Sequence, residues 1–278
     1  MRGIKRLMDD RFALVCIGFL FLVLIAGIFA PLFAPHSPYE MNVKEKFSGI
    51  SWDYPLGTDQ LGRCIFSRLL YGIRTTVFLS LLTMVITILI GTVLGMLAGV
   101  FRGKMDEIIM RICDVFLSFP SEVMILAIIG MMGPGLLNVV LATIIAKWAW
   151  YTRMIRSVVL QYTDQHYIQV AKVAGCGTTH IVRRHILPAA TGELSVLATL
   201  DAGAVILMIS ALSFLGLGVQ APMPEWGMML NEAKNVMVVH PYQMLAPGLA
   251  ILFVVAAFQF VGDSLQDAWN VKRVSRRR

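Results

Sequence analysis

Six apolar segments, each roughly as long as a membrane helix, dominate this chain of 278 residues. A helix needs about 20 mostly apolar residues to cross the hydrocarbon core of a bilayer. The segments that approach or exceed this length are 12–33, 76–100, 109–132, 136–158, 194–217 and 245–262. The sequence therefore predicts an all-α polytopic membrane protein with six transmembrane helices.

The composition favours the same class of protein. Apolar residues make up 57% of the chain and charged residues 15%, whereas soluble proteins average about 45–50% and about 25%. The net charge of +7 is also seen in nucleic-acid-binding proteins, but membrane proteins collect Lys and Arg in their cytoplasmic loops. We therefore expect a lipid bilayer, and no nucleic acid, as a partner.

Both ends of the chain are expected in the cytoplasm. The apolar run 12–30 exceeds the 7–15 residues of a signal-peptide core, so it predicts a retained first span. With both termini inside, the cytoplasmic segments carry seventeen Lys and Arg and the outer segments six, as the positive-inside rule requires. Two parts follow: 1–75, a first span with an extracytoplasmic segment, and 76–278, a core membrane domain.

Glycines recur every fourth residue in the second predicted span, at Gly91, Gly95 and Gly99. Small residues let membrane helices approach closely. This stripe predicts a surface for helix packing, and a sliding surface between subunits is the alternative.

The segment 161–190, between the fourth and fifth spans, has the pattern of two short helices outside the membrane. Gly175 is expected to end the first helix in a left-handed conformation, and Thr178 or Thr179 can cap the start of the second. Pro188 is expected to break the chain before the fifth span. Such a helix–turn–helix suits docking on a soluble partner; an amphipathic loop on lipid headgroups is the alternative.

This segment resembles the coupling loop of ABC importer permeases, whose signature is Glu-Ala-Ala, three residues, Gly and a downstream Leu-Pro. Gln169 stands where that family has Glu, and Val170 where it has the first Ala. The resemblance implies contact with an ATPase subunit at Gln169, Val170, Ala171, Gly175, His185, Leu187 and Pro188.

Two further motifs resemble the peptide/nickel branch of this family. They are 56–63 with the residues up to Arg74, in which Cys64 replaces a usual Asp, and 213–218 with 224–227. The resemblance implies a type I ABC importer permease in the inner membrane of a bacterium. Its expected partners are a homologous permease subunit, two cytoplasmic ATP-binding subunits and an extracytoplasmic substrate-binding protein.

No cofactor is expected in this chain, because ATP and magnesium would be bound by the ATPase subunits. Gly103-Lys104 lacks the remaining residues of a phosphate-binding loop. The stretches 147–151 and 196–203 resemble nickel or metal-chelate permeases, specifically the C-type subunit of nickel transport systems. Nickel or a metal chelate is therefore the expected substrate, with di- or oligopeptides as the alternative.

Asp201 is the first candidate for the translocation pathway. It lies in the fifth predicted span, roughly 10 Å from its start at 1.5 Å per residue, where a charged residue is costly and is usually functional. Its carboxylate could attract a cation or an amine; a packing hydrogen bond, or a contact with a partner subunit, is the alternative. Glu122, near Pro120 in the third span, is a second candidate. The histidines have no ligand spacing, so the sequence identifies no metal ligands.

Two other classes of protein compete with this hypothesis. A stand-alone secondary transporter often contains inverted repeats, and the six segments show no such duplication. An intramembrane hydrolase would need a Ser–His or a metal-ligand pair at membrane depth, and no histidine lies in a predicted span. We therefore do not expect an enzyme.

Overall fold

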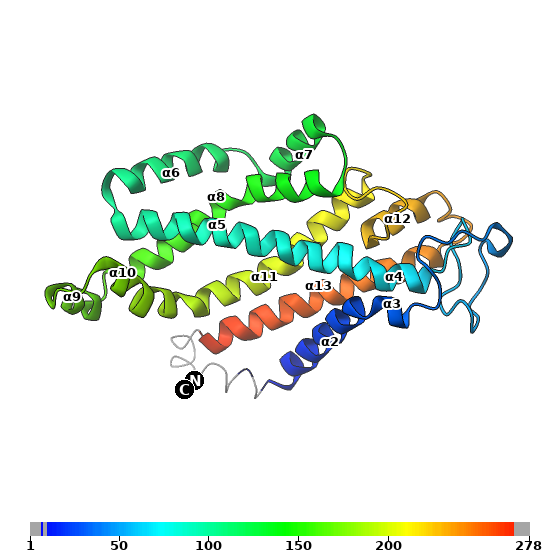
Figure 1. The fold of residues 1–278 in the computed structure, drawn as a ribbon, viewed down its shortest axis with the longest axis horizontal. Helices are drawn as coiled ribbons and strands as arrows, with labels where there is room; N and C mark the ends of the chain where they lie inside the picture. Colours follow the sequence, from blue (N-terminus) through cyan, green and yellow to red (C-terminus); the bar gives the residue numbers. More distant parts are fainter. Residues whose placement is uncertain (1–6, 8–9, 270–278) are drawn as a thin grey trace.

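The structure is a computed structural model that describes residue 7 and residues 10–269. It is an elongated bundle of helices (Figure 1). The α-helices are α2 (Arg11–Ile28), α3 (Ala30–Phe33), α4 (Ile65–Ile73), α5 (Leu79–Phe101), α6 (Gly103–Leu117), α7 (Ser121–Met132), α8 (Leu136–Thr163), α9 (His166–Val173), α10 (Thr178–Ile181), α11 (Leu187–Phe214), α12 (Trp226–Lys234) and α13 (Tyr242–Trp269). The short elements are the 3-10 turn η1 (Val43–Glu45) and the π-helical turns η2 (Arg74–Phe78) and η3 (Val182–Ile186).

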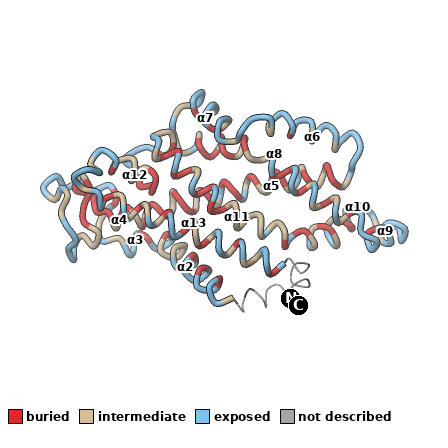
Figure 2. Tube along the Cα trace, turned by 180° about the vertical axis from the view of Figure 1, so that it is seen from behind, coloured by how far each residue is buried: buried red, intermediate tan, exposed pale blue. Residues whose placement is uncertain are grey.

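The long helices α5, α8, α11 and α13 form the body of the bundle (Figure 1). These helices contain many of the buried residues, whereas α6, α7 and α9 are largely exposed (Figure 2). Many large apolar side chains point outward, such as Phe21 and Leu22 on α2. Exposed apolar side chains over long helices are what a lipid-facing surface requires.

Four helices within the described residues are long and apolar enough to cross a membrane: Arg11–Ile28, Ile65–Phe101, Thr178–Phe214 and Tyr242–Trp269. A fifth crossing is possible if the bent pair α6 and α7 counts as one span. The fourth predicted span corresponds to α8, which has 28 residues but falls outside this group. Its apolar sequence is interrupted by Lys147 and Arg153. Within the described residues, four or five segments are thus long and apolar enough to cross a membrane, and not the predicted six.

The prediction of one continuous helix over 109–132 is wrong. The chain bends by 79° between α6 and α7, and Pro120 is the residue directly before α7. Proline lacks the N–H for a helical hydrogen bond, and it disfavours helical backbone in the residue before it. The break at 118–120 follows from both effects.

The prediction that Pro188 breaks the chain is also wrong. A single helix of 37 residues runs from Thr178 to Phe214. Pro188 lies in the first turn of α11, directly after the π-helical turn η3. The N–H of Leu187 donates to the carbonyl of Val182 in that turn. The wider π turn changes the local hydrogen-bond pattern, so the helix continues through the proline.

The glycine stripe of the second span packs α5 against α8. A Cβ at Gly95 would lie 2.7 Å from the carbonyl oxygen of Thr152, and one at Gly99 would lie 2.7 Å from Cγ1 of Val159. Such distances are below van der Waals contact, so any side chain here would push the helices apart. The stripe serves helix packing within this chain.

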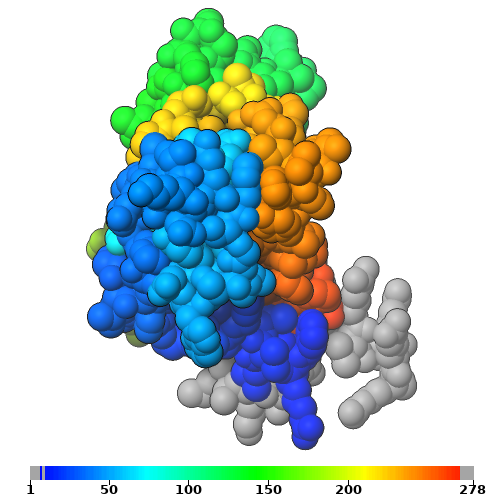
Figure 3. Space-filling view, turned by 90° about the vertical axis from the view of Figure 1, so that its right-hand side faces the viewer, coloured from blue at the N-terminus to red at the C-terminus, as the bar shows by residue number. Residues whose placement is uncertain are grey.

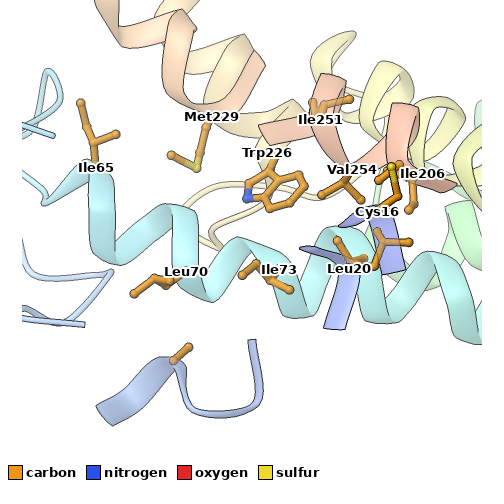
Figure 4. Packing of buried hydrophobic residues seen from close by; sticks show 13 residues of the cluster. Cys16, Leu20, Ile65, Leu70, Ile73, Ile206, Trp226, Met229, Ile251 and Val254 are labelled. Carbon is orange, nitrogen blue, oxygen red and sulfur yellow. The ribbon is translucent and has the colours of Figure 1, made fainter. Parts of the chain in front are cut away.

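One end of the bundle is built around Trp226. Its indole lies among Ile73, Ile251 and Val254 from α4 and α13 (Figure 4), and its Nε1 donates a 2.9 Å hydrogen bond to the carbonyl of Leu69. The space-filling view of this end shows the N-terminal third of the chain, in blue, lying beside the orange segment around α12 (Figure 3). We call this end, which contains α4, α12 and the segment before α4, the capped end. It lies opposite the end that carries α9 and α10 (Figure 1).

Candidate functional site

The segment predicted to couple to a partner forms two helices that project from one end of the bundle (Figure 1). They are α9 and α10, joined by residues 174–177. Ile168 is fully buried and packs with Ile181 and Val159, whereas Val173 is 89% exposed. One face of α9 is thus anchored to the body of the protein, and the other is available to another molecule.

Gly175 makes the turn between these helices. Its φ of +80° lies in the left-handed region, which glycine adopts without steric cost. The N–H of Gly175 donates to the carbonyl of Lys172 and the N–H of Cys176 to that of Ala171, both at 3.0 Å. These two bonds form a Schellman motif, which ends a helix in a defined geometry. The expected left-handed glycine is confirmed; Gly177, not a threonine, precedes α10 as its cap.

The remaining residues of the predicted coupling surface lie in three environments. Gln169 and Val170 are exposed on α9, and Ala171 is half-buried. His185 lies in η3, with its ring centroid 6.0 Å from those of both Tyr167 and His180. Leu187 is half-buried and Pro188 exposed at the start of α11.

A second set of functional candidates meets inside the bundle. Lys147 on α8 donates to both carboxylate oxygens of Asp201 on α11, at 2.6 and 2.8 Å. The hydroxyl of Tyr151, one turn after Lys147, donates to the same carboxylate. Each side chain of the ion pair is only 12% exposed. The carboxylate of Asp201 therefore has a positively charged partner within the same chain.

A pocket of about 200 Å³ borders this ion pair. Its lining consists of Phe116, Leu117, Phe119, Ser121, Ala146, Lys147, Trp150 and Asp201. Ser121 also donates a 3.0 Å hydrogen bond to Glu122, which is itself exposed. Both pathway candidates thus lie at or beside one pocket, at the break between α6 and α7.

Lys147 is the partner of Asp201 that the sequence analysis left out. Its signal was present, because Lys147 and Asp201 are opposite charges inside two different predicted spans. Charged residues within membrane helices commonly pair with one another. Sequence alone does not give the rotation of each helix, on which the contact depends.

The capped end holds a network of four charges. Arg63 bonds Asp59 and Glu232 at 2.6 and 2.9 Å, and Arg68 bonds the same two carboxylates at 2.7 and 2.6 Å. Asp59, Arg63 and Arg68 belong to the motif before the second span, and Glu232 lies on α12. The network therefore joins α12 to the start of α4 and closes this end.

Glu225, the N-cap residue of α12, is a further buried carboxyl at the capped end. It is fully buried and belongs to the segment that connects α11 to α13 along the chain. Thr76 in η2 and Ser210 on α11 donate to its Oε1, at 3.0 and 3.3 Å, and the N–H of Met228 donates to its Oε2 at 2.7 Å. Burial raises the pKa of this carboxyl above its usual value, while the hydrogen bonds oppose the rise.

Among residue 7 and residues 10–269, no three His, Cys, Asp or Glu side chains come close enough together to hold a metal ion. The fold and these sites define a polytopic helical membrane protein with a projecting pair of short helices and an ion pair beside a pocket.

Comparison with known proteins identifies the family. Residues 91–275 match the binding-protein-dependent transport system inner membrane component. Residues 2–49 match the N-terminal transmembrane domain of oligopeptide transport permease C. The chain belongs to the peptide/nickel branch of the ABC importer permeases, whose members are transport subunits and not themselves enzymes.

Three relatives cover nearly the whole chain. The metal-staphylopine import system permease CntC of Staphylococcus aureus (strain Mu50) is 44% identical over 265 residues, which are 95% of this chain and 92% of CntC. The nickel transport system permease NikC of Escherichia coli (strain K12) is 36% identical over 257 residues, 92% of each chain. The dipeptide transport system permease DppC of Alkalihalophilus pseudofirmus is 37% identical over 271 residues, 98% of this chain and 89% of DppC.

Proposed function

We propose that this chain is one of two permease subunits of a bacterial ABC importer that carries nickel or a metal chelate. A homologous permease would complete the pathway, and two cytoplasmic ATPase subunits would hydrolyse ATP and grip the coupling helices of the two permeases. An extracytoplasmic binding protein would deliver the substrate. Closure of the ATPases would then tilt the packed helices between inward- and outward-open arrangements, as in other rigid-body transport cycles.

The observation that carries this proposal is the projecting pair α9 and α10. Ile168 holds its inner face to the bundle, and the Schellman motif at Gly175 fixes the angle between the helices. Its outer face presents exposed Val170 and Val173. An anchored, projecting helix with exposed apolar residues suits a groove on a soluble protein.

The proposed topology has six crossings with both termini in the cytoplasm. The bent pair α6–α7 and the long helix α8 would add two crossings to the four apolar helices. The ion pair with Asp201 offsets the cost of Lys147 at membrane depth. Asp10, at the start of α2, accepts a 2.7 Å hydrogen bond from Ser264 near the end of α13, which supports placing the start of the first span and the end of the last on one side.

The proposed substrate rests on the relatives. CntC and NikC are named for import of metal–staphylopine and of nickel, and together they favour a metal or metal chelate. DppC is named for dipeptides and is as similar as NikC, so a di- or oligopeptide is the second candidate.

The test is uptake by the assembled importer in proteoliposomes, with radiolabelled nickel and a radiolabelled dipeptide as competing probes. ATP-dependent nickel uptake would support the proposal, and dipeptide uptake alone would support the second candidate. A cysteine at Val173 should crosslink to the ATPase subunit, whereas one at Trp52, fully exposed at the capped end, should not. Transport by this chain without ATPase subunits would instead indicate a secondary transporter.

A further inference from the structure

The ion pair Lys147–Asp201, whose side chains are each 12% exposed, borders a pocket, which a contact that only packs two helices does not require. The pocket of about 200 Å³ is far larger than the about 10–15 Å³ that one water molecule requires. It therefore has room for a small organic molecule.

The lining of the pocket includes two kinds of side chain, aromatic and charged. Phe116, Phe119 and Trp150 provide aromatic surface, and the ion pair provides one positive and one negative group. The broken backbone between α6 and α7 lies at its edge. Irregular backbone at membrane depth is tolerated where it lines a polar cavity or is buried in protein, so the break is consistent with a wet, ligand-accessible site.

The charges of the pair determine which ligand suits the pocket. A bare divalent cation that bound Asp201 would displace Lys147 and leave its ammonium group beside the metal, where the two positive charges repel. A simple anion that bound Lys147 would leave Asp201 without its partner. A ligand with both a carboxylate and an amine can replace both halves of the pair at once and leave no buried charge unpaired.

We propose that Lys147 and Asp201 form a substrate subsite for a small molecule that carries both a carboxylate and an amine. The carboxylate accepts from the Nζ of Lys147, and an amine N–H donates to Asp201, while the aromatic side chains contact the rest of the molecule. An amino-acid-like metal chelate meets this requirement, because a metal-bound amine keeps its N–H groups and a metal-bound carboxylate keeps a free oxygen. A dipeptide meets it as well. This inference rests on the proposed function, because it names the substrate class of that importer.

The first experiment measures uptake by the whole importer in proteoliposomes with saturating binding protein. The probes are radiolabelled nickel alone, the preformed nickel–histidine complex and labelled dialanine. ATP hydrolysis is measured in the same vesicles, so that substrate moved per ATP can be calculated. Wild type without any ATP-dependent uptake would reject the proposed function itself, whichever role the ion pair has.

The variants are Lys147→Met, Asp201→Asn and the charge reversal Lys147→Asp with Asp201→Lys. We expect each to lower uptake of the nickel–histidine complex or of dialanine per ATP at least tenfold. The matched control is Arg153→Gln, which removes an ion pair between α8 and Asp114 on α6 at an exposed position and should leave this ratio unchanged.

The charge reversal distinguishes a subsite from a structural contact. If the pair only holds α8 to α11, reversal restores both assembly and wild-type uptake, and that result would overturn the inference. Faster uptake of nickel alone than of the complex, improved further by Lys147→Met, would also overturn it.

A second measurement leaves both members of the ion pair unchanged. The fluorescence of Trp150 is recorded in the importer without binding protein, and the Trp150→Phe importer gives the blank. The added compounds are dialanine, the nickel–histidine complex and two blocked analogues of dialanine, one with the amine acetylated and one with the carboxylate amidated. We expect only dialanine or the nickel–histidine complex to change this fluorescence. Equal responses to both blocked analogues would reject a site that needs both charges.

Discussion

The hydroxyl of Thr76 donates a 3.0 Å hydrogen bond to Oε1 of Glu225, and so joins a π-helical turn of the second span to the N-cap of α12. Isolated π turns within α-helices are frequent at functional positions. Here the turn brings Thr76 to a carboxyl that also caps α12 through Met228. The contact ties the capped end of the molecule to a membrane helix.

The buried carboxyl of Glu225 should make stability depend on pH. Burial raises its pKa in the folded protein above the ordinary 4.5, so the folded state holds the proton more tightly than the unfolded state. The stabilising contribution is full below about pH 4.5 and is lost as the pH rises through the raised pKa. Glu225→Gln keeps an acceptor without the charge, so its melting temperature should fall less between pH 4.5 and 8.

Thermal unfolding of the purified complex in detergent checks this, with the exposed Glu40 changed to Gln as the control. Parallel pH profiles for wild type and Glu225→Gln would contradict the prediction.

Gly175 should be essential for coupling because of its backbone conformation. Alanine at a φ of +80° costs about 1–2 kcal/mol. Proline is worse, because its φ is fixed near −65° and it lacks the N–H that donates to Lys172. We expect Gly175→Ala to reduce ATP-dependent uptake and Gly175→Pro to abolish it while the chain still inserts in the membrane.

The matched control is Gly177→Ala, at a glycine with an ordinary negative φ and open space around it. Co-purification of the ATPase subunits and uptake are measured together. Normal uptake by Gly175→Pro would remove this turn from the coupling mechanism.

Removing one half of the Lys147–Asp201 pair should destabilise the fold. Both side chains are 12% exposed, and breaking a buried pair typically costs about 3–5 kcal/mol. Lys147→Met should therefore unfold at a lower temperature than wild type, whereas Arg153→Gln at the exposed pair should change stability by at most about 1 kcal/mol. Denaturation followed by circular dichroism compares them. If Lys147→Met and Arg153→Gln lost equally little stability, the carboxylate of Asp201 would have to be solvated, which would contradict this prediction.

A side chain at Gly95 should separate α5 from α8. The nearest atoms to its Cβ would be backbone, the carbonyl oxygen of Thr152 at 2.7 Å and the N of Arg156 at 3.0 Å, which cannot move aside as a flexible side chain can. Overpacking costs about 1–3 kcal/mol or more, so Gly95→Leu should lower the yield of folded complex. Gly130→Leu, in open space on α7, should not, and gel filtration of both variants gives the measurement.

The sequence predicted the features that are set by a few neighbouring residues, such as the length of an apolar run or the backbone conformation of a glycine. Apolar runs of membrane length identified the helices, and Gly175 identified the turn of the projecting element. The break at 118–120 and the continuity through Pro188 were not predicted, since a proline can end, kink or begin a helical segment. Which outcome occurs depends on the hydrogen bonds of neighbouring turns, and the π turn η3 is not visible in the sequence.

The candidate site was only half predictable for a different reason. Depth along a span can be counted from the sequence, and it identified Asp201. Its contact with Lys147 depends on how α8 and α11 are rotated toward each other, and the pocket depends on a bend in a third helix. These are tertiary relationships, to which a single sequence gives no direct access.

The unbroken helix from Thr178 to Phe214 has a mechanical consequence. Ile181 in the projecting element and Asp201 beside the pocket are twenty residues apart on this one rod, or about 30 Å at 1.5 Å per residue. No loop lies between them to absorb a displacement. A displacement or rotation of the helix at Ile181 is therefore transmitted along the helix to Asp201, whose carboxylate is paired with Lys147.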